Sequence, residues 1–159
     1  MTKKSRIFYF FISLVLFIVM DIYLSNYAVK YGFNIVQNEF VDIVYVQNKG
    51  AAFSIFEGAK WFLILFALLT SLFITQYTIR NITRWRVLTI FLISMLNAGI
   101  ITNMIERLCL GYVRDYIKLN FVDFPVFNIS DIFINISVFS IVIIILINKY
   151  AINNENYNR

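Results

Sequence analysis

Two aspartates, Asp115 and Asp131, are the residues of this sequence best suited to carry out a reaction. Two carboxyl groups that share one site cannot both ionise cheaply, so the pair keeps one proton between them. Such a pair can activate water, because the ionised carboxylate takes a proton from the water while the protonated carboxyl polarises a carbonyl group. A pair of this kind would be the catalytic centre of a hydrolase.

Both aspartates lie in the stretch 103–131, where charge is concentrated in an otherwise apolar chain. The charged residues that stand out there are Glu106, Arg107, Arg114, Asp115, Asp123 and Asp131. Ionisable groups beside apolar spans are costly and usually functional, but they need not be catalytic. Asp115 could instead form a solvated ion pair with Arg114 or Arg107. Asp131 could be a charge favoured by the positive end of a helix, and the residue types alone leave these alternatives open.

The rest of the composition narrows the chemistry. The chain has no histidine, which excludes Ser-His and Cys-His nucleophilic schemes and histidine-based metal sites. The single cysteine, Cys109, cannot form an internal disulfide. A Ser54–Lys60 pair is a weak alternative nucleophile, because nothing in the sequence brings these two residues together.

The elements that must position the aspartates are membrane spans. The chain has 159 residues, of which 60% are apolar and 14% charged, and this composition indicates a single membrane-embedded domain. Its mean hydropathy is +0.75. Apolar runs of about 18 or more residues are typical of transmembrane helices. Four such runs predict spans at 7–24, 61–79, 87–105 and 129–147.

Two more polar segments, 26–60 and 106–128, connect these spans on one side of the membrane. Residues 40–46 are β-branched and aromatic, which favours a strand. Asn48 and Gly50 suit a turn, after which residues 51–56 could return as a second strand. We therefore expect a mainly α membrane protein with a small extracytoplasmic β-sheet.

The charge distribution predicts the orientation. The basic residues of the amino terminus, the 80–86 loop and the carboxyl-terminal tail are Lys3, Lys4, Arg6, Arg80, Arg84, Arg86, Lys149 and Arg159. Only Glu155, of nine acidic residues, accompanies them. By the positive-inside rule both termini are cytoplasmic, so the net charge of +5 reflects topology and does not indicate nucleic-acid binding. Asp21 then lies at the outer face, as a border residue or as a helper in a polar site.

Four segments, in this order, resemble the lipoprotein signal peptidases (signal peptidase II). Residues 47–54 resemble the family's N-x-G-A-A segment, and residues 103–107 resemble its G-N-x-x-D-R segment. Residues 111–117 resemble G-x-V-x-D followed by an aromatic and an aliphatic residue, and residues 127–131 resemble F-N-x-x-D. Each motif alone is weak, but four in the right order and topology are strong.

The resemblance implies an aspartic endopeptidase that removes the signal peptide of diacylglyceryl-modified prolipoproteins by cutting before the lipidated cysteine. Asp115 and Asp131 would be catalytic. Supporting or substrate-binding positions would be Asn48, Gly50, Asn103, Arg107, Asn128 and Asp21. The resemblance implies no metal or organic cofactor. It also implies a bacterial cytoplasmic-membrane protein whose active site lies at the outer face, with segment 26–60 forming a cradle over a substrate that enters from the lipid. We expect a monomer.

The chain departs from the family pattern at four positions. Glu106 replaces an aspartate, Thr102 replaces a glycine at a close-packed point, Ser25 replaces a lysine, and Gln47 replaces a common arginine. The departures leave a second hypothesis open, in which the protein is a non-catalytic or altered-specificity relative that binds lipoprotein precursors or another membrane partner. A transporter using buried acids as a proton relay is disfavoured, because the acids gather at one face.

Overall fold

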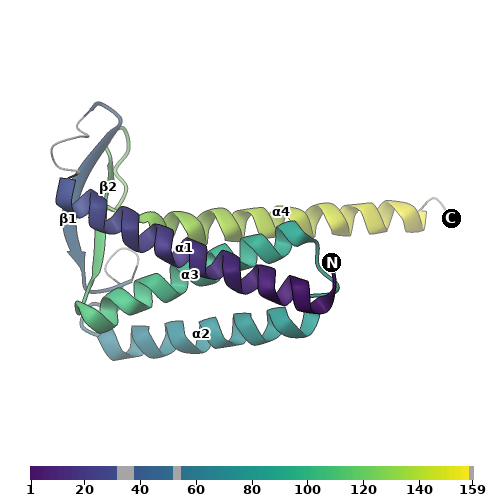
Figure 1. Cartoon of the computed structure of the whole chain (residues 1–159). Coiled ribbons are helices and arrows are strands. Elements are labelled where there is room, and N and C mark those ends of the chain that lie inside the picture. The colour runs from purple at the N-terminus through teal and green to yellow at the C-terminus, as the bar shows by residue number, and fades with distance from the viewer. Residues whose placement is uncertain (32–37, 52–54, 158–159) are drawn as a thin grey trace.

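The computed structural model describes residues 1–31, 38–51 and 55–157. Its helices are α1 (Lys3–Tyr31), α2 (Lys60–Asn81), α3 (Val87–Cys109) and α4 (Ile129–Tyr157), and its strands are β1 (Val41–Asn48) and β2 (Val113–Leu119). The helices run alongside one another, and the two strands stand across one end of the bundle (Figure 1).

All four helices are long and apolar enough to cross a membrane, which confirms the four predicted spans. All four helices continue past the predicted ends of the spans: α1 to Tyr31, α2 to Asn81, α3 to Cys109 and α4 to Tyr157. The expected boundaries at 24 and 105 marked only where the apolar run ends. A helix satisfies its own backbone hydrogen bonds, so it can continue into a more polar environment until a turn residue stops it. Gly111, with φ of 89°, follows α3 in this way.

The small sheet is confirmed, but its predicted pairing is wrong. β1 pairs with β2 in antiparallel register, with Val46 opposite Asp115 and Asn48 opposite Val113. Of the expected return strand at 51–56, residues 52–54 lie outside the described residues. Ile55 and Phe56 form a turn instead of a strand, and the left-handed φ of 60° at Phe56 is incompatible with an extended chain.

Helix α3 is the centre of the bundle and packs against each of the other three helices. Half of its span is buried inside the protein, compared with about a fifth of each other span. At Gly99 this helix lies close against α4, because a Cβ atom there would lie 2.6 Å from the Ser130 carbonyl oxygen and 2.9 Å from Ile134 Cγ1. Small residues allow such close approach between membrane helices.

The two ends of the bundle have different chemistry. At the end away from the sheet, the Arg6 guanidinium of α1 donates hydrogen bonds to the carbonyl oxygens of Ile82 and Trp85. The amino terminus and the basic α2–α3 connection therefore lie together, and the carboxyl end of α4 points the same way (Figure 1). The acidic residues beside the sheet lie at the opposite end.

We predict that Gly99→Ala destabilises the bundle by about 1–3 kcal/mol, the usual cost of overpacking. The methyl group would meet the backbone of α4, and backbone cannot yield as a flexible side chain does. The measurement is the thermal unfolding midpoint in detergent. The matched control is Ala67→Val on the partly exposed face of α2, which should change the midpoint little. An unchanged midpoint for Gly99→Ala would contradict this packing.

Candidate active site

Asp131 is held at the start of α4 by a reciprocal cap. The Asn128 side-chain oxygen accepts the Asp131 backbone N–H at 2.9 Å, and Asp131 Oδ2 accepts the Asn128 backbone N–H at 3.2 Å. Each side chain thus satisfies a backbone donor at the helix terminus that has no partner within the helix. The Asn103 side-chain amide of α3 donates to the other Asp131 oxygen at 3.1 Å. These contacts fix the carboxyl group in position.

Asp115 projects from β2 and is buried. The Asn48 side-chain amide of β1 donates to one of its oxygens at 2.9 Å, and the Asn128 amide donates to the other at 2.9 Å. The strand pairing explains the first contact, because Asn48 ends β1 directly beside this part of β2. A buried carboxyl needs such partners, since an unsatisfied one is costly.

Asn128 links the two aspartates. Its side chain donates to Asp115 and accepts from the backbone of Asp131, and its amide also lies 3.2 Å from the Asn103 side-chain oxygen. One asparagine therefore sets the carboxyl group of a strand relative to the carboxyl group of a helix. The structure brings Asp115, Asp131, Asn48, Asn103 and Asn128 into one polar cluster.

The basic residues nearby have other partners. Arg107 donates to the carbonyl oxygens of Gly50 at 2.7 Å and Asn103 at 3.1 Å, so it ties the turn after β1 to α3. Arg114 forms an ion pair with Glu106 at 2.6 Å. Among the described residues, no other salt bridge is formed. The alternative in which Asp115 is neutralised by Arg114 or Arg107 as an ion pair is therefore wrong.

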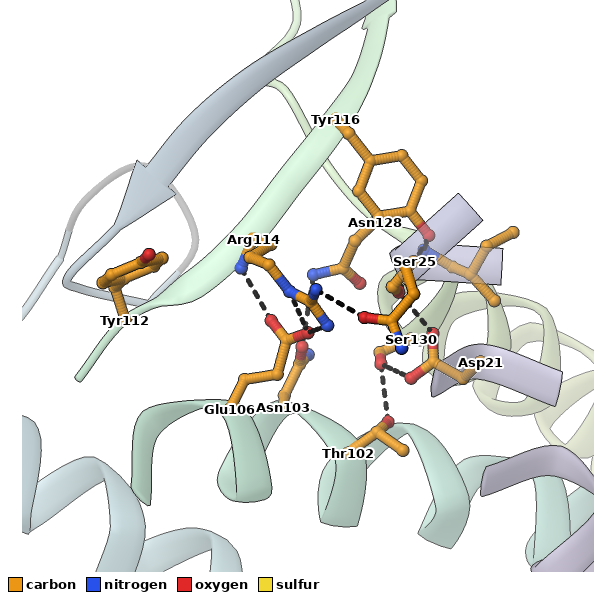
Figure 2. Close-up of polar contacts among 12 residues, drawn as sticks. Asp21, Ser25, Thr102, Asn103, Glu106, Tyr112, Arg114, Tyr116, Asn128 and Ser130 are labelled. Carbon is orange, nitrogen blue, oxygen red and sulfur yellow. Dashed lines mark hydrogen bonds and ion pairs between the residues drawn. The ribbon is translucent and has the colours of Figure 1, made fainter. Parts of the chain in front are cut away.

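Glu106 holds Arg114 by more than charge. Its carboxylate accepts the Arg114 backbone N–H and Nε–H, both at 2.7 Å, while the guanidinium also donates to Asn26 of α1 at 2.8 Å (Figure 2). One glutamate therefore connects the sheet-side ends of α1 and α3 with the start of β2.

Asp21, the remaining predicted support residue, lies outside the cluster of the two aspartates. It is buried in α1 and accepts hydrogen bonds from Ser130 at 2.5 Å and Ser25 at 3.3 Å (Figure 2). Thr102, which we expected to crowd α3, is buried and lies 2.6 Å from the Ser130 hydroxyl. The position that admits no side chain is Gly99, one turn earlier.

The two carboxyl groups open onto a cavity of about 480 Å³. Its lining residues include Val46, Gln47, Asn48, Ala51, Asn103, Arg107, Asp115, Phe124, Phe127, Asp131, Ile134 and Asn135. The walls combine apolar side chains with polar groups that converge on the two carboxyls, as in a binding site that orients its ligand. Segment 124–127 was absent from our predicted site. Its position follows from an isolated antiparallel pairing of Ile117 with Phe127, which the sequence pattern does not reveal.

The surroundings of Asp115 favour its protonated form. Burial raises its pKa to about 7. The hydrogen bond from Asn48 lowers the pKa, the nearby charge of Asp131 raises it, and the contact with Asn128 and the charge of Arg107 lower it. This carboxyl group therefore exchanges its proton near neutral pH, where a general acid or base works best. In the described ranges, no three acidic or cysteine side chains are grouped to hold a metal ion.

Comparison with known proteins identifies the family. The pattern described as Signal peptidase (SPase) II matches residues 11–147. The chain belongs to the signal peptidase II family. It is 36% identical over 105 residues to the lipoprotein signal peptidase of Streptococcus thermophilus (strain CNRZ 1066), covering 65% of this chain and 67% of that protein. It is 39% identical, with the same coverage, to that of Streptococcus pyogenes serotype M5 (strain Manfredo).

Solved structures agree with this assignment. The fold matches a bacterial membrane enzyme solved by the in meso method at 2.3 Å resolution, with a TM-score of 0.77 and 27% identity over 88% of each chain. A second bacterial membrane enzyme, solved at 1.9 Å, matches with a TM-score of 0.73 and 28% identity, covering 86% of this chain and 92% of that one. Membership of the signal peptidase II family makes the protein a membrane protease.

The cluster predicts opposite changes in the pKa of Asp115 for two variants. Asp131→Asn removes a negative charge, so the pKa should fall from about 7. Asn48→Leu keeps the site filled but removes a hydrogen bond that stabilises the ionised form, so the pKa should rise. Carbon-13 NMR of labelled aspartates in detergent measures both values. A shift of the same sign in both variants would contradict the geometry.

Proposed function

We propose that this protein is an aspartic endopeptidase that removes the signal peptide from diacylglyceryl-modified prolipoproteins, cutting before the lipidated cysteine. The observation that carries the proposal is the arrangement around Asn128, whose side chain contacts Asp115 and the backbone of Asp131 at once. Its relatives in two streptococci are lipoprotein signal peptidases. The cavity beside the two carboxyls supports the same reaction, since it can admit an extended peptide.

In the proposed mechanism a water molecule lies between the two carboxyl groups. Asp115, with a pKa near 7, holds the shared proton and polarises the scissile carbonyl. Asp131 accepts a proton from the water as its oxygen attacks the carbonyl carbon. The tetrahedral intermediate then collapses: the carbon–nitrogen bond breaks, and the leaving amine nitrogen takes a proton from the pair. Neither carboxyl forms a covalent bond to the substrate.

The asparagines orient the carboxyls during this reaction. Amide donors from β1, α3 and the start of α4 fix three of the four carboxyl oxygens through Asn48, Asn103 and Asn128. The fourth oxygen accepts the backbone N–H of Asn128. Such fixed dipoles need not reorganise as charge moves, which is the largest source of catalysis in many enzymes. No metal or organic cofactor takes part in this scheme.

The membrane setting follows from the same geometry. The basic end of the bundle would face the cytoplasm and the end with the sheet the outside. The cavity reaches down to Ile134 and Asn135 of α4, which supports entry of the lipid-modified substrate from the bilayer. One chain supplies both carboxyls and all their amide donors, so a monomer suffices.

We predict that Asp115→Asn and Asp131→Asn each lower cleavage of a lipidated precursor by roughly a hundredfold to ten-thousandfold, because each removes one half of the acid–base pair. The measurement is turnover by purified protein in lipid, with precursor binding measured in parallel. Asp123→Asn, at an exposed loop position, is the matched control and should cleave normally. Normal turnover by either aspartate variant would contradict the catalytic pair. If the wild-type protein binds the precursor without cleaving it, the protein is a non-catalytic relative.

The orientation has a separate test, because Cys109 is the only cysteine and is exposed. It ends α3 at the sheet end, so a membrane-impermeant maleimide should label it in intact cells. The matched variant carries Cys109→Ser and Thr83→Cys, which moves the thiol to the basic α2–α3 connection. That variant should be labelled only after the membrane is permeabilised. The reverse pattern would overturn the proposed topology.

A further inference from the structure

A second polar network lies next to the catalytic pair, and the proposed mechanism does not use it. Its centre is Asp21, which is buried in α1. On one side Ser25 contacts Asp21 at 3.3 Å and the Tyr116 hydroxyl at 3.1 Å. On the other side Ser130 contacts Asp21 at 2.5 Å and Thr102 at 2.6 Å. Figure 2 shows these side chains converging from α1, α3, α4 and β2.

The donors in this network have a definite direction. Ser25 and Ser130 each donate their single hydroxyl proton to a different carboxyl oxygen of Asp21. The Ser25 oxygen must then accept from Tyr116. Burial raises the pKa of Tyr116 to about 12, so this hydroxyl keeps the proton that it donates. The Tyr116 oxygen in turn accepts the Ile129 backbone N–H at 3.3 Å.

The other branch follows the same rule. Ser130 gives its proton to Asp21, and its oxygen lies 2.6 Å from the Thr102 hydroxyl. The single proton of Thr102 also faces the carbonyl oxygens of Ala98 at 2.9 Å and Gly99 at 3.2 Å, so Thr102 anchors this branch to the backbone of α3. Two branches of hydroxyl groups therefore end on the two oxygens of one carboxylate. Buried polar networks of this kind are rigid when every member is satisfied.

The two branches reach the catalytic pair through neighbouring residues. Tyr116 follows Asp115 in β2, and Ser130 precedes Asp131 in α4. Tyr116 also accepts from Ile129, the first residue of α4. The network thus joins the backbone on either side of the cavity at the residues adjacent to the two carboxyls.

We propose that Ser25 and Thr102 are positioning residues of the active site. Through Asp21 they tie β2 to the first turn of α4, and so they set the separation of the two catalytic carboxyls. This role rests on the proposed function of Asp115 and Asp131. Ser25 and Thr102 are both positions at which this sequence departs from the signal peptidase II pattern. The network therefore depends on side chains particular to this chain.

The test removes single hydroxyl groups. Ser25→Ala breaks the first branch and Thr102→Val breaks the second while keeping the side-chain volume. Tyr116→Phe breaks the first branch again, should Ser25→Ala fail to fold. The matched controls are Ser13→Ala in α1 and Ser137→Ala in α4, which remove buried hydroxyls elsewhere on the same helices. In the described part of the chain the Ser137 hydroxyl has no hydrogen-bond partner.

The first readout does not depend on turnover. The titration midpoint of Asp115, followed by carbon-13 NMR, reports its surroundings: Asp131 from α4, Arg107 from α3, and the amides of Asn48 and Asn128. If β2 and α4 were held less tightly, water would reach Asp115 and the repulsion between the Asp115 and Asp131 carboxylates would weaken. Both changes lower the pKa, so the midpoint should fall below the wild-type value in the test variants and stay constant in the controls.

The second readout is the cleavage of a lipidated precursor. The test variants should lose about tenfold or more in kcat with KM unchanged, because misplaced catalytic groups slow the reaction without weakening binding. A lower thermal midpoint with unchanged kcat and an unchanged Asp115 titration would overturn the proposal and leave a structural role. If wild-type protein binds without cleaving, the proposed function fails, and the Asp115 titration alone decides whether the network positions the pair.

Discussion

A carboxyl group withdrawn from water must find hydrogen-bond donors inside the protein, and the rest of this structure depends on how two such groups, buried Asp115 and half-buried Asp131, find theirs. The donors are the side chains of Asn48, Asn103 and Asn128, which belong to β1, α3 and the start of α4. Amide groups carry no charge, so they stabilise a carboxylate without fixing it as an ion pair. This choice of partner leaves Asp115 able to hold a proton near neutral pH.

The need to bring these donors together explains the packing. Helix α3 can lie close to α4 because Gly99 leaves no side chain between them. That closeness allows Asn103 to reach Asp131 and Thr102 to reach Ser130. Glu106, with Arg114, then joins the sheet-side end of α3 to β2. Glu106 makes three contacts with Arg114 of β2. The Arg114 guanidinium in turn donates to Asn26 of α1.

Much of this arrangement could be predicted from the sequence. Apolar length determines the four spans, and the charge pattern drew attention to Asp115 and Asp131. The family resemblance added the three asparagines. The partner of β1 could not be predicted, because β2 is far away in the sequence and a nearer segment looked suitable. The Asp21 network was missed for a similar reason: hydroxyl side chains such as Ser25 and Ser130 carry no pattern until the helices are packed.

The central claim is that the two carboxyls act together on one water molecule. The most direct test is a crystal structure of the wild-type protein in a lipid phase with a non-cleavable lipidated peptide bound. We expect one oxygen atom, from a water molecule or from a hydrated peptide carbonyl, to lie within about 3 Å of both carboxyl groups. Carboxyls that hydrogen-bond to separate waters, with the scissile carbonyl beside only one of them, would contradict the account.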